Sequence, residues 1–392
     1  MSIILHSNGS GVAGRLVASV VGLVMMLGAG WLLFWNEGRA VKAQQALEEG
    51  RDAVVSLLTV EKELEANEGC LAHAQGTART EESVREPLFG FEVPCLRLVR
   101  QVEYYQWVER KDKRHTQQDD GSAKMRTHYH YTQRWVDRPV NSRMFRETHH
   151  RNTVALDLPS DSCWGAKRVH MGAFLLHAGQ VSRAGEVAEL SAAQVQLPPE
   201  WAARGTWSGN SFYIGCNGPA NADNPQIGDV RITWSAAPQQ AQVTLVAQQR
   251  GHTFVPYVAK SGYTVDLLRN GCYSAAEMFE HAMQQNQILC WVLRGVGVLL
   301  MLVGMCMALM VLRGLVGWIP LLGGLLEGGV VLVGLAAGVL VSLVIVASAW
   351  FFYRPLLAAG LIFFGVIPVY YLISRRRRNP LHASGKISEN RI

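Results

Sequence analysis

The sequence predicts an α+β membrane protein in which four apolar helices carry one large domain of mixed β-sheet and helix. Two observations predict this class. Four long runs without charged residues are unevenly placed, one near the N-terminus and three near the C-terminus. The 252 residues between the first two runs are mostly polar, and they contain stretches in which polar and apolar residues alternate, as in β-strands.

The first run covers residues 16–35, after a short N-terminal segment of residues 1–15. Twenty helical residues reach about 30 Å, which is the thickness of the hydrocarbon core of a bilayer. A cleaved signal peptide is the alternative, but Phe34, Trp35, Asn36 and Glu37 follow in place of a small-residue cleavage site. We therefore expect an uncleaved transmembrane helix.

The other three runs, 295–312, 328–353 and 356–374, predict transmembrane helices at 288–312, 328–353 and 356–374. Arg294 and Arg313 are the charges that close the first of these runs on either side. The third and fourth are separated by only two residues, Arg354 and Pro355, so they should form an antiparallel hairpin. The segment 313–327 between the second and third helices contains Pro320 and is too short to span. We expect it to be an interfacial loop.

The basic tail predicts the orientation. Residues 375–392 begin with Arg375, Arg376, Arg377 and Arg378, and the positive-inside rule places such a tail in the cytoplasm. Four spans then place both termini in the cytoplasm and the domain of residues 36–287 on the far side. That side is the periplasm if the chain is from the cytoplasmic (inner) membrane of a bacterium. It is the lumen of an organelle if the chain is from a eukaryote.

The net charge of +6 does not indicate a nucleic-acid-binding protein. Residues 36–287 contain 27 Lys and Arg against 29 Asp and Glu, so the large domain has a formal charge of −2. The excess of basic residues therefore lies beside the apolar runs. It is a signal of topology and of attraction to anionic lipid headgroups.

Residues at the ends of the runs are expected to lie at the membrane interface, where aromatic and charged side chains gather. They are Trp35, Asn36, Glu37, Arg39, Trp350, Tyr353, Arg354 and the four tail arginines. Inside the third run, Gly334 and Gly338 are four residues apart, a spacing that allows close helix packing and self-association.

The cysteines permit disulfides if the large domain lies in an oxidising compartment. Five of the seven fall in that domain, so they cannot all pair within one chain. We predict the pairs Cys70–Cys95 and Cys163–Cys216, although spacing alone leaves other connectivities open. No cysteine and histidine spacing indicates a zinc site.

Within the domain, the pattern predicts a helix over 43–58 with Leu47, Val54, Leu57 and Leu58 on one face. Alternating residues at 98–108 and 126–136, around an Asp-Gly turn, predict a long β-hairpin. Strands at 228–235 and 242–249 are expected to form a second antiparallel pair, followed by short strands at 253–257 and 264–268. A short helix is possible at 171–178, and the rest of 156–225 is not assigned. Ser274 and Glu277 form a capping box that opens a helix leading into the second run.

Candidate chemistry is weak. His128 and His130 share one face of a strand, and His149 and His150 are adjacent, but exposed hairpins also collect histidines. The stretch 160–163 contains nucleophile types without a nucleophile elbow or a catalytic cysteine signature. We therefore assign no catalytic residue, cofactor or metal ligand, and predict that the protein is not an enzyme.

Seven short motifs resemble the LUMA family, also called the transmembrane protein 43 family. They are WNEGRAVK at 35–42, LVRQVEYYQWVE at 98–109, residues 129–135 with Asn141 and Ser142, GDVR at 228–231, QRG at 249–251, KSG at 260–262 and AWFFYRPL at 349–356. Their order and spacing agree over about residues 20–375. The Ala-, Arg- and Trp-rich composition indicates a bacterial member.

The resemblance implies four spans, a large domain between the first two, and self-association. Eukaryotic members are associated with the endoplasmic reticulum and inner nuclear membrane, so the resemblance implies that location if this chain is eukaryotic. They are thought to act as scaffolds that bind lamins and emerin, and no catalytic residue comes with the family. We therefore expect a homo-oligomeric membrane scaffold that contacts the lipid bilayer and other membrane or envelope proteins, and no nucleic acid. The alternatives are a far-side enzyme or ligand-binding domain acting on lipid or envelope material, and a component of an oligomeric channel.

Overall fold

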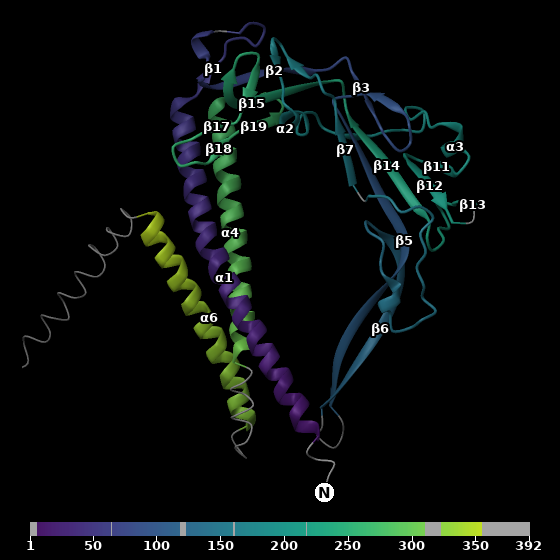
Figure 1. Ribbon diagram of the computed structural model, residues 1–392, viewed down its shortest axis with the longest axis vertical. Coiled ribbons are helices and arrows are strands. Elements are labelled where there is room, and N and C mark those ends of the chain that lie inside the picture. The colour runs from purple at the N-terminus through teal and green to yellow at the C-terminus, as the bar shows by residue number, and fades with distance from the viewer. Residues whose placement is uncertain are drawn as a thin grey trace, which may run out of the picture. The chain divides into compact units, whose positions relative to one another are not determined.

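The computed structural model describes residues 6–63, 65–117, 123–159, 161–216, 218–309 and 323–354. The chain divides into two compact units. The helical unit comprises Met1–Glu49, Ala259–Tyr263 and Phe279–Ile392, and the β-rich unit comprises Gly50–Val258 and Thr264–Met278. Figure 1 shows both units. The predicted α+β class with a large β-rich domain is confirmed.

The helical unit is built from α1 (His6–Ala53), α4 (Ala275–Ala308) and α6 (Gly323–Tyr353). All three are long and apolar enough to cross a membrane. They contain the first and third predicted spans in full, and the second, 288–312, as far as Ala308. The fourth predicted span, 356–374, and the arginine tail lie outside the described residues, as does most of the predicted loop 313–327.

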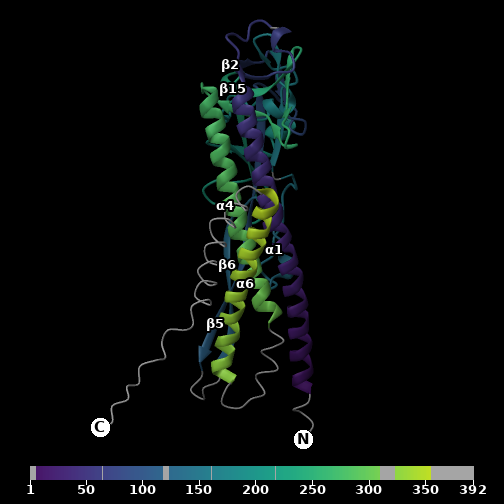
Figure 2. The same cartoon turned by 90° about the vertical axis from the view of Figure 1, so that its left-hand side faces the viewer.

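The three helices pack side by side with α4 antiparallel to the other two (Figure 2). Gly22 of α1 faces Gly304 of α4, and Leu33 faces Gly297, so the contacts run in opposite directions along the two helices. The predicted packing glycines, Gly334 and Gly338, lie against α4 of the same chain. Glycine thus allows close contact between helices within one molecule.

Both spanning helices that flank the large domain extend beyond the predicted spans. Helix α1 continues without a break to Ala53, so it absorbs most of the helix predicted at 43–58. The predicted apolar face is wrong at its end, because the helix stops before Leu58, which is 99% exposed. Helix α4 starts at the predicted capping box. The Ser274 hydroxyl and backbone N–H both donate to Glu277 Oε2, and the Glu277 N–H donates to Ser274 Oγ.

The β-rich unit contains a mixed seven-stranded sheet in the order β1-β2-β8-β9-β16-β15-β19. Strand β15 is its long central member and pairs antiparallel with β2, β16 and β19. The bounds are β1 (Val55–Ser56), β2 (Leu71–Arg79), β8 (His170–Met171), β9 (Phe174–Leu175), β15 (Gln240–Arg250), β16 (Thr253–Val255) and β19 (Leu267–Asn270).

An antiparallel eight-stranded sheet has the central order β11-β12-β14-β5-β6, with β7, β10 and β13 at its sides. Its bounds are β5 (Arg97–Gln117), β6 (Ala123–Val136), β7 (Asp161–Gly165), β10 (Ala188–Glu189), β11 (Gly205–Ser208), β12 (Ser211–Gly215), β13 (Gly218–Pro219) and β14 (Val230–Ala237). Two further hairpins are β3 (Ser83–Arg85) with β4 (Glu92–Pro94), and β17 (Tyr257–Val258) with β18 (Thr264–Val265). The short helices are η1 (Glu65–Asn67), η2 (Ser142–Met144), α2 (Ala178–Val181) and α3 (Pro199–Ala202).

The predicted hairpin is confirmed and is longer than expected. The first part of β5, up to Tyr104, pairs with β14, whereas its later part, from Tyr104 to Gln117, pairs with β6. The hairpin therefore projects from the sheet as an arm, which we call the β5–β6 arm (Figure 1). Its Asp-Gly turn lies outside the described residues.

Two local expectations are wrong. The strands expected at 228–235 and 242–249 exist as β14 and β15, but they belong to different sheets. The connection between them is tight, yet β14 pairs with β5, and β15 pairs with β2. The helix considered at 171–178 is instead the small hairpin β8–β9, in which Met171 pairs with Phe174.

A single hydrophobic core joins the two sheets. It receives Ala74 from β2, Leu245 from β15 and Val102 from β5, and it is centred on Trp234 of β14. Trp234 is fully buried, with Phe89 and Phe91 packed edge-on against its ring. This core fixes the root of the β5–β6 arm.

Candidate functional site

A buried ion pair links the three apolar helices. Arg294 of α4 donates from Nε and Nη2 to the two carboxylate oxygens of Glu37 in α1, at 2.5 and 2.7 Å. Trp350 of α6 donates from Nε1 to Glu37 Oε2 at 2.9 Å. The Glu37 side chain is 1% exposed and that of Arg294 is 17% exposed. Bidentate pairing and a third donor satisfy this carboxylate, which would otherwise be costly to bury.

Aromatic rings complete the surroundings of the guanidinium. The Arg294 Cζ atom lies 4.7 Å from the centre of the Trp291 ring and 5.8 Å from that of Trp350. Both distances are within the range of cation–π attraction. The charge of Arg294 is therefore stabilised by a carboxylate in one direction and by ring faces in another.

Amide hydrogen bonds extend this arrangement along α1 and α4. Asn36 Nδ2 donates to the Cys290 carbonyl at 3.1 Å, and Arg39 Nη1 donates to Asn286 Oδ1 at 3.1 Å. Asn286 Nδ2 in turn donates to the Ala40 carbonyl at 3.0 Å. We call the set Asn36, Glu37, Arg39, Asn286, Arg294 and Trp350 the polar layer.

Gly38 has a separate packing role in the same motif. A Cβ atom at this position would lie 2.5 Å from Cζ of Tyr353, so only glycine lets the tyrosine ring approach α1. The ring also packs on Phe34, with centroids 5.4 Å apart. The four residues from Asn36 to Arg39 thus make different contacts. The Asn36 amide and the Arg39 guanidinium bond to α4, the Glu37 carboxylate bonds to α4 and α6, and Gly38 packs against α6.

The predicted interface residues divide into two groups. Asn36 and Glu37 are buried, and their side chains form hydrogen bonds with neighbouring helices. These polar groups are therefore turned toward other helices and not outward. Trp35 is 44% exposed and stacks on Trp31. Arg375 to Arg378 lie outside the described residues. The position of this set at a membrane surface stays a prediction.

Sequence reasoning missed Asn286, Cys290 and the role of Arg294. Arg294 was interpreted only as a charge that closes an apolar run. The signal that could have revealed the pair is the position of Glu37. This residue of opposite charge follows another apolar run, on the same predicted side of the membrane. Two opposite charges at matching depth are candidates for a pair between helices.

A cavity of about 780 Å³ lies beside the polar layer, within the helical unit. Its lining combines side-chain amides with indole rings, guanidinium groups and carboxylates. The polar and aromatic members are Gln44, Gln45, Glu48, Glu280, Gln284, Gln287, Trp291, Arg294, Trp350 and Arg354. This chemistry, with both signs of charge, suits a polar or zwitterionic group with an attached apolar portion.

The candidate nucleophiles and histidines of the β-rich unit take different positions. Ser162 accepts a hydrogen bond from Arg100 Nη2 at 3.1 Å, beside the buried pair of Arg100 and Glu86. Ser160 lies outside the described residues. His128 and His130 are exposed on β6, whereas His149 and His150 gather with Glu147 on a loop.

All seven cysteines are free in the structure, so neither predicted disulfide is formed there. Cys95 is buried in the core, and desolvation raises the pKa of its thiol to about 11. Cys216 lies 3.8 Å from Thr153 Oγ1. The pairs Cys70–Cys95 and Cys163–Cys216 remain predictions for oxidised protein.

Comparison with known proteins identifies the family. The family model described as Transmembrane protein 43 matches residues 104–355, which include α4, α6 and the part of the β-rich unit that follows Glu103. The chain belongs to this family. Transmembrane protein 43 of Mus musculus is 35% identical over 367 residues, covering 91% of this chain and 89% of the mouse protein.

Two further members of the transmembrane protein 43 family show how far the similarity reaches. The protein of Homo sapiens is 33% identical over 367 residues, with 91% and 89% of the two chains covered. The homolog of Drosophila melanogaster is 30% identical over 365 residues, with 89% and 92% covered. No solved structure gives a significant match. The resemblance to the LUMA family is confirmed, and the chain is a multi-pass membrane protein of a family that is not a known enzyme family.

Proposed function

We propose that this member of the transmembrane protein 43 family is a membrane scaffold that organises membrane or envelope partners through its β-rich domain. The observation that carries the proposal is the polar layer. Its carboxylate is saturated by Arg294 and Trp350, so it has no spare capacity to act as a base or nucleophile. Such a layer fixes the register of α1, α4 and α6, which a rigid anchor needs.

The topology is part of this proposal. The fourth apolar run, 356–374, and the basic tail support four spans with both termini in the cytoplasm. The β-rich unit then lies in the periplasm of a bacterial cell or the lumen of a eukaryotic organelle. There the β5–β6 arm offers long strand edges and exposed side chains to a partner, including a second copy of this chain.

Crosslinking in native membranes tests the scaffold role. Wild-type protein is compared with a variant in which residues 112–128 are replaced by Asn-Gly, which shortens the arm between the paired Lys111 and Tyr129. We expect wild-type protein to crosslink reproducibly to itself or to neighbours, and the short-arm variant to lose part of that set. His252→Gln, an exposed change on another segment, is the control. A strictly monomeric wild-type protein with no reproducible neighbour contradicts the proposal.

A second candidate function is ligand binding at the cavity of the helical unit, with a phospholipid headgroup as ligand. The favouring observation is the lining, in which Trp291, Arg354 and the carboxylates of Glu48 and Glu280 stand beside four glutamines. A zwitterionic headgroup offers a phosphate to the guanidinium and a cationic amine to the carboxylates. Native mass spectrometry of the purified protein should then retain a zwitterionic phospholipid in preference to an anionic one. Arg354→Gln should reduce that retention, and equal retention of both lipids by wild-type protein would exclude this function.

A further inference from the structure

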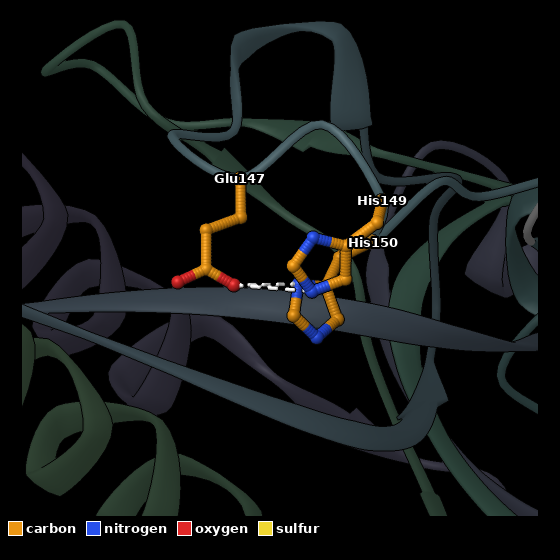
Figure 3. A group of neighbouring side chains, drawn as sticks. All are labelled: Glu147, His149 and His150. Carbon is orange, nitrogen blue, oxygen red and sulfur yellow. Dashed lines mark ion pairs between the residues drawn. The ribbon is translucent and has the colours of Figure 1, made fainter.

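Glu147, His149 and His150 converge on one point of the loop that follows η2 in the β-rich unit. His149 Nε2 lies 3.2 Å from Glu147 Oε2, and His150 Nδ1 lies 3.3 Å from the same oxygen. Figure 3 shows both dashed ion pairs meeting at this one oxygen. One ligand atom from each of the three residues can be chosen so that all lie within 4.8 Å of one another.

Hydrogen bonding does not account for this convergence. The Nδ1 atom of His150 is buried and makes no hydrogen bond, although the carboxylate oxygen is 3.3 Å away. The two imidazole centroids are only 4.1 Å apart, so both rings lie close to the same carboxylate. One metal ion between them can accept a nitrogen from each ring and an oxygen from the carboxylate.

The distances match a coordination sphere. Zinc binds imidazole nitrogen and carboxylate oxygen at about 2.0–2.2 Å in tetrahedral geometry, which separates neighbouring ligand atoms by about 3.3–3.5 Å. Two of the three separations already approach that value. The third can adjust because His149 is 71% exposed and has room to rotate.

The loop is held firmly enough to present these ligands. The backbone N–H of Glu147 donates to the Tyr131 hydroxyl at 3.0 Å, and that hydroxyl donates to Glu109 Oε2 at 2.7 Å. The His150 ring stacks on Tyr131, with centroids 4.0 Å apart, and contacts the edge of Trp107. Both aromatic residues belong to the root of the β5–β6 arm, so a regular sheet fixes one ligand and the main chain of another.

We propose that Glu147, His149 and His150 form a binding site for a first-row transition-metal dication, with water completing the coordination. Two imidazoles and one carboxylate suit such ions, and a three-residue set leaves an open position. The site would tie the loop after η2 to the arm. It goes beyond the scaffold role, since it assigns a ligand to the β-rich unit.

Zinc and cobalt binding to the full-length protein tests the proposal. Protein without a histidine tag is purified in detergent, stripped with a chelator, titrated with Zn²⁺, and separated from free metal by gel filtration. We expect close to one retained Zn²⁺ per chain and, with Co²⁺, a visible absorption band of tetrahedral type. Glu147→Gln and His149→Ala should each weaken binding by about tenfold or more. Both side chains are largely exposed, so their loss should leave the fold intact, which circular dichroism checks.

The matched control removes a different histidine pair, from the hairpin against which the loop packs. In His128→Ala/His130→Ala, two exposed histidines are lost from β6, and we expect wild-type retention of Zn²⁺. The proposal is overturned if wild-type protein retains no metal. It is also overturned if Glu147→Gln and His149→Ala bind as tightly as wild type, or if the control loses as much metal as they do.

Discussion

At the scale of single residues, the buried charges of this protein are held by groups far away in the sequence. Glu37 and Arg294 belong to helices whose paired positions are 257 residues apart. In the β-rich unit, Glu86 is fully buried and accepts hydrogen bonds from Arg100 and from the Phe89 backbone. In both places a buried carboxylate accepts hydrogen bonds from an arginine and a second donor, and removal of either member of the ion pair leaves the other buried without its partner.

Glu37→Gln should therefore destabilise the helical unit. Breaking one side of a buried ion pair costs about 3–5 kcal/mol, because the remaining charge stays buried. Thermal unfolding in detergent, followed by tryptophan fluorescence, measures the loss. The double variant Glu37→Leu/Arg294→Met, which removes both charges, should recover most of it. Wild-type stability of Glu37→Gln would show that the pair does not contribute.

The cysteines should differ strongly in reactivity. Burial raises the pKa of Cys95 to about 11 and also blocks access, whereas Cys163, Cys216 and Cys272 are exposed. The thiolate is the reactive form, so Cys95 should alkylate far more slowly than the other three at neutral pH. Peptide mapping after iodoacetamide treatment checks this. In oxidised protein, protection of both Cys163 and Cys216 that disappears on reduction would support the predicted disulfide.

The contact of His252 with Glu63 gives a pH prediction. The hydrogen bond that the His252 ring donates to Glu63 raises the pKa of His252 above its ordinary value of 6.5. A raised folded-state pKa means that the stabilisation is fully present below 6.5 and is lost as the pH rises through the higher value. The melting temperature of wild type minus that of His252→Gln should thus be larger at about pH 5.5 than at about pH 8.5. The effect should be small because His252 is exposed, and a difference that grows with pH would refute it.

At the scale of helices and strands, glycine sets the distance between α1 and α4. A Cβ atom on Gly22 would lie 2.5 Å from the backbone nitrogen of Ala308 and 2.6 Å from the Gly304 oxygen. Backbone cannot move aside as a flexible side chain can. The two helices must therefore separate or shift if any other residue replaces Gly22.

Gly22→Ala should accordingly cost about 1–3 kcal/mol, the usual range for overpacking. Gly28→Ala is the matched control on the same helix, because its added methyl group would meet nothing within 4 Å. We expect a lowered melting temperature and faster trypsin cleavage for the first variant only. Equal behaviour of the two variants would show that the contact at Gly22 is not needed.

Local patterns predicted the elements well, and nonlocal pairing was out of their reach. The hairpin of β5 and β6 follows from alternation around one turn, and the start of α4 follows from the hydrogen bonds between Ser274 and Glu277. By contrast, β14 and β15 are adjacent in sequence but enter different sheets, which only the shared core decides. The polar layer depends on contacts between helices that are far apart in the sequence. The convergence of His149 and His150 on Glu147 depends on the folded shape of their loop. Sequence patterns identified some of these residues but not the contacts between them.

At the scale of the whole molecule, the proposed four-span topology predicts the location of both termini. A cytoplasm-active reporter, such as a fluorescent protein, should be active when fused after Ile392 or before Met1. A reporter that is active only on the far side should work when it is inserted between β5 and β6, after Gln117. Three spans in place of four would put the reporter after Ile392 on the far side and would refute the fourth span.

The long sequence separation within the polar layer has a consequence for the synthesis of the protein. Glu37 leaves the ribosome 257 residues before Arg294 and 313 residues before Trp350. At a translation rate of about 5–20 residues per second, Arg294 is synthesised about 13–50 s after Glu37, and Trp350 is synthesised later still. During that interval α1 is an inserted helix with an unmatched charge at its end. The polar layer can therefore form only late in synthesis, when all three helices are present. Variants that cannot form it should keep an unpaired charge and be degraded by membrane quality control.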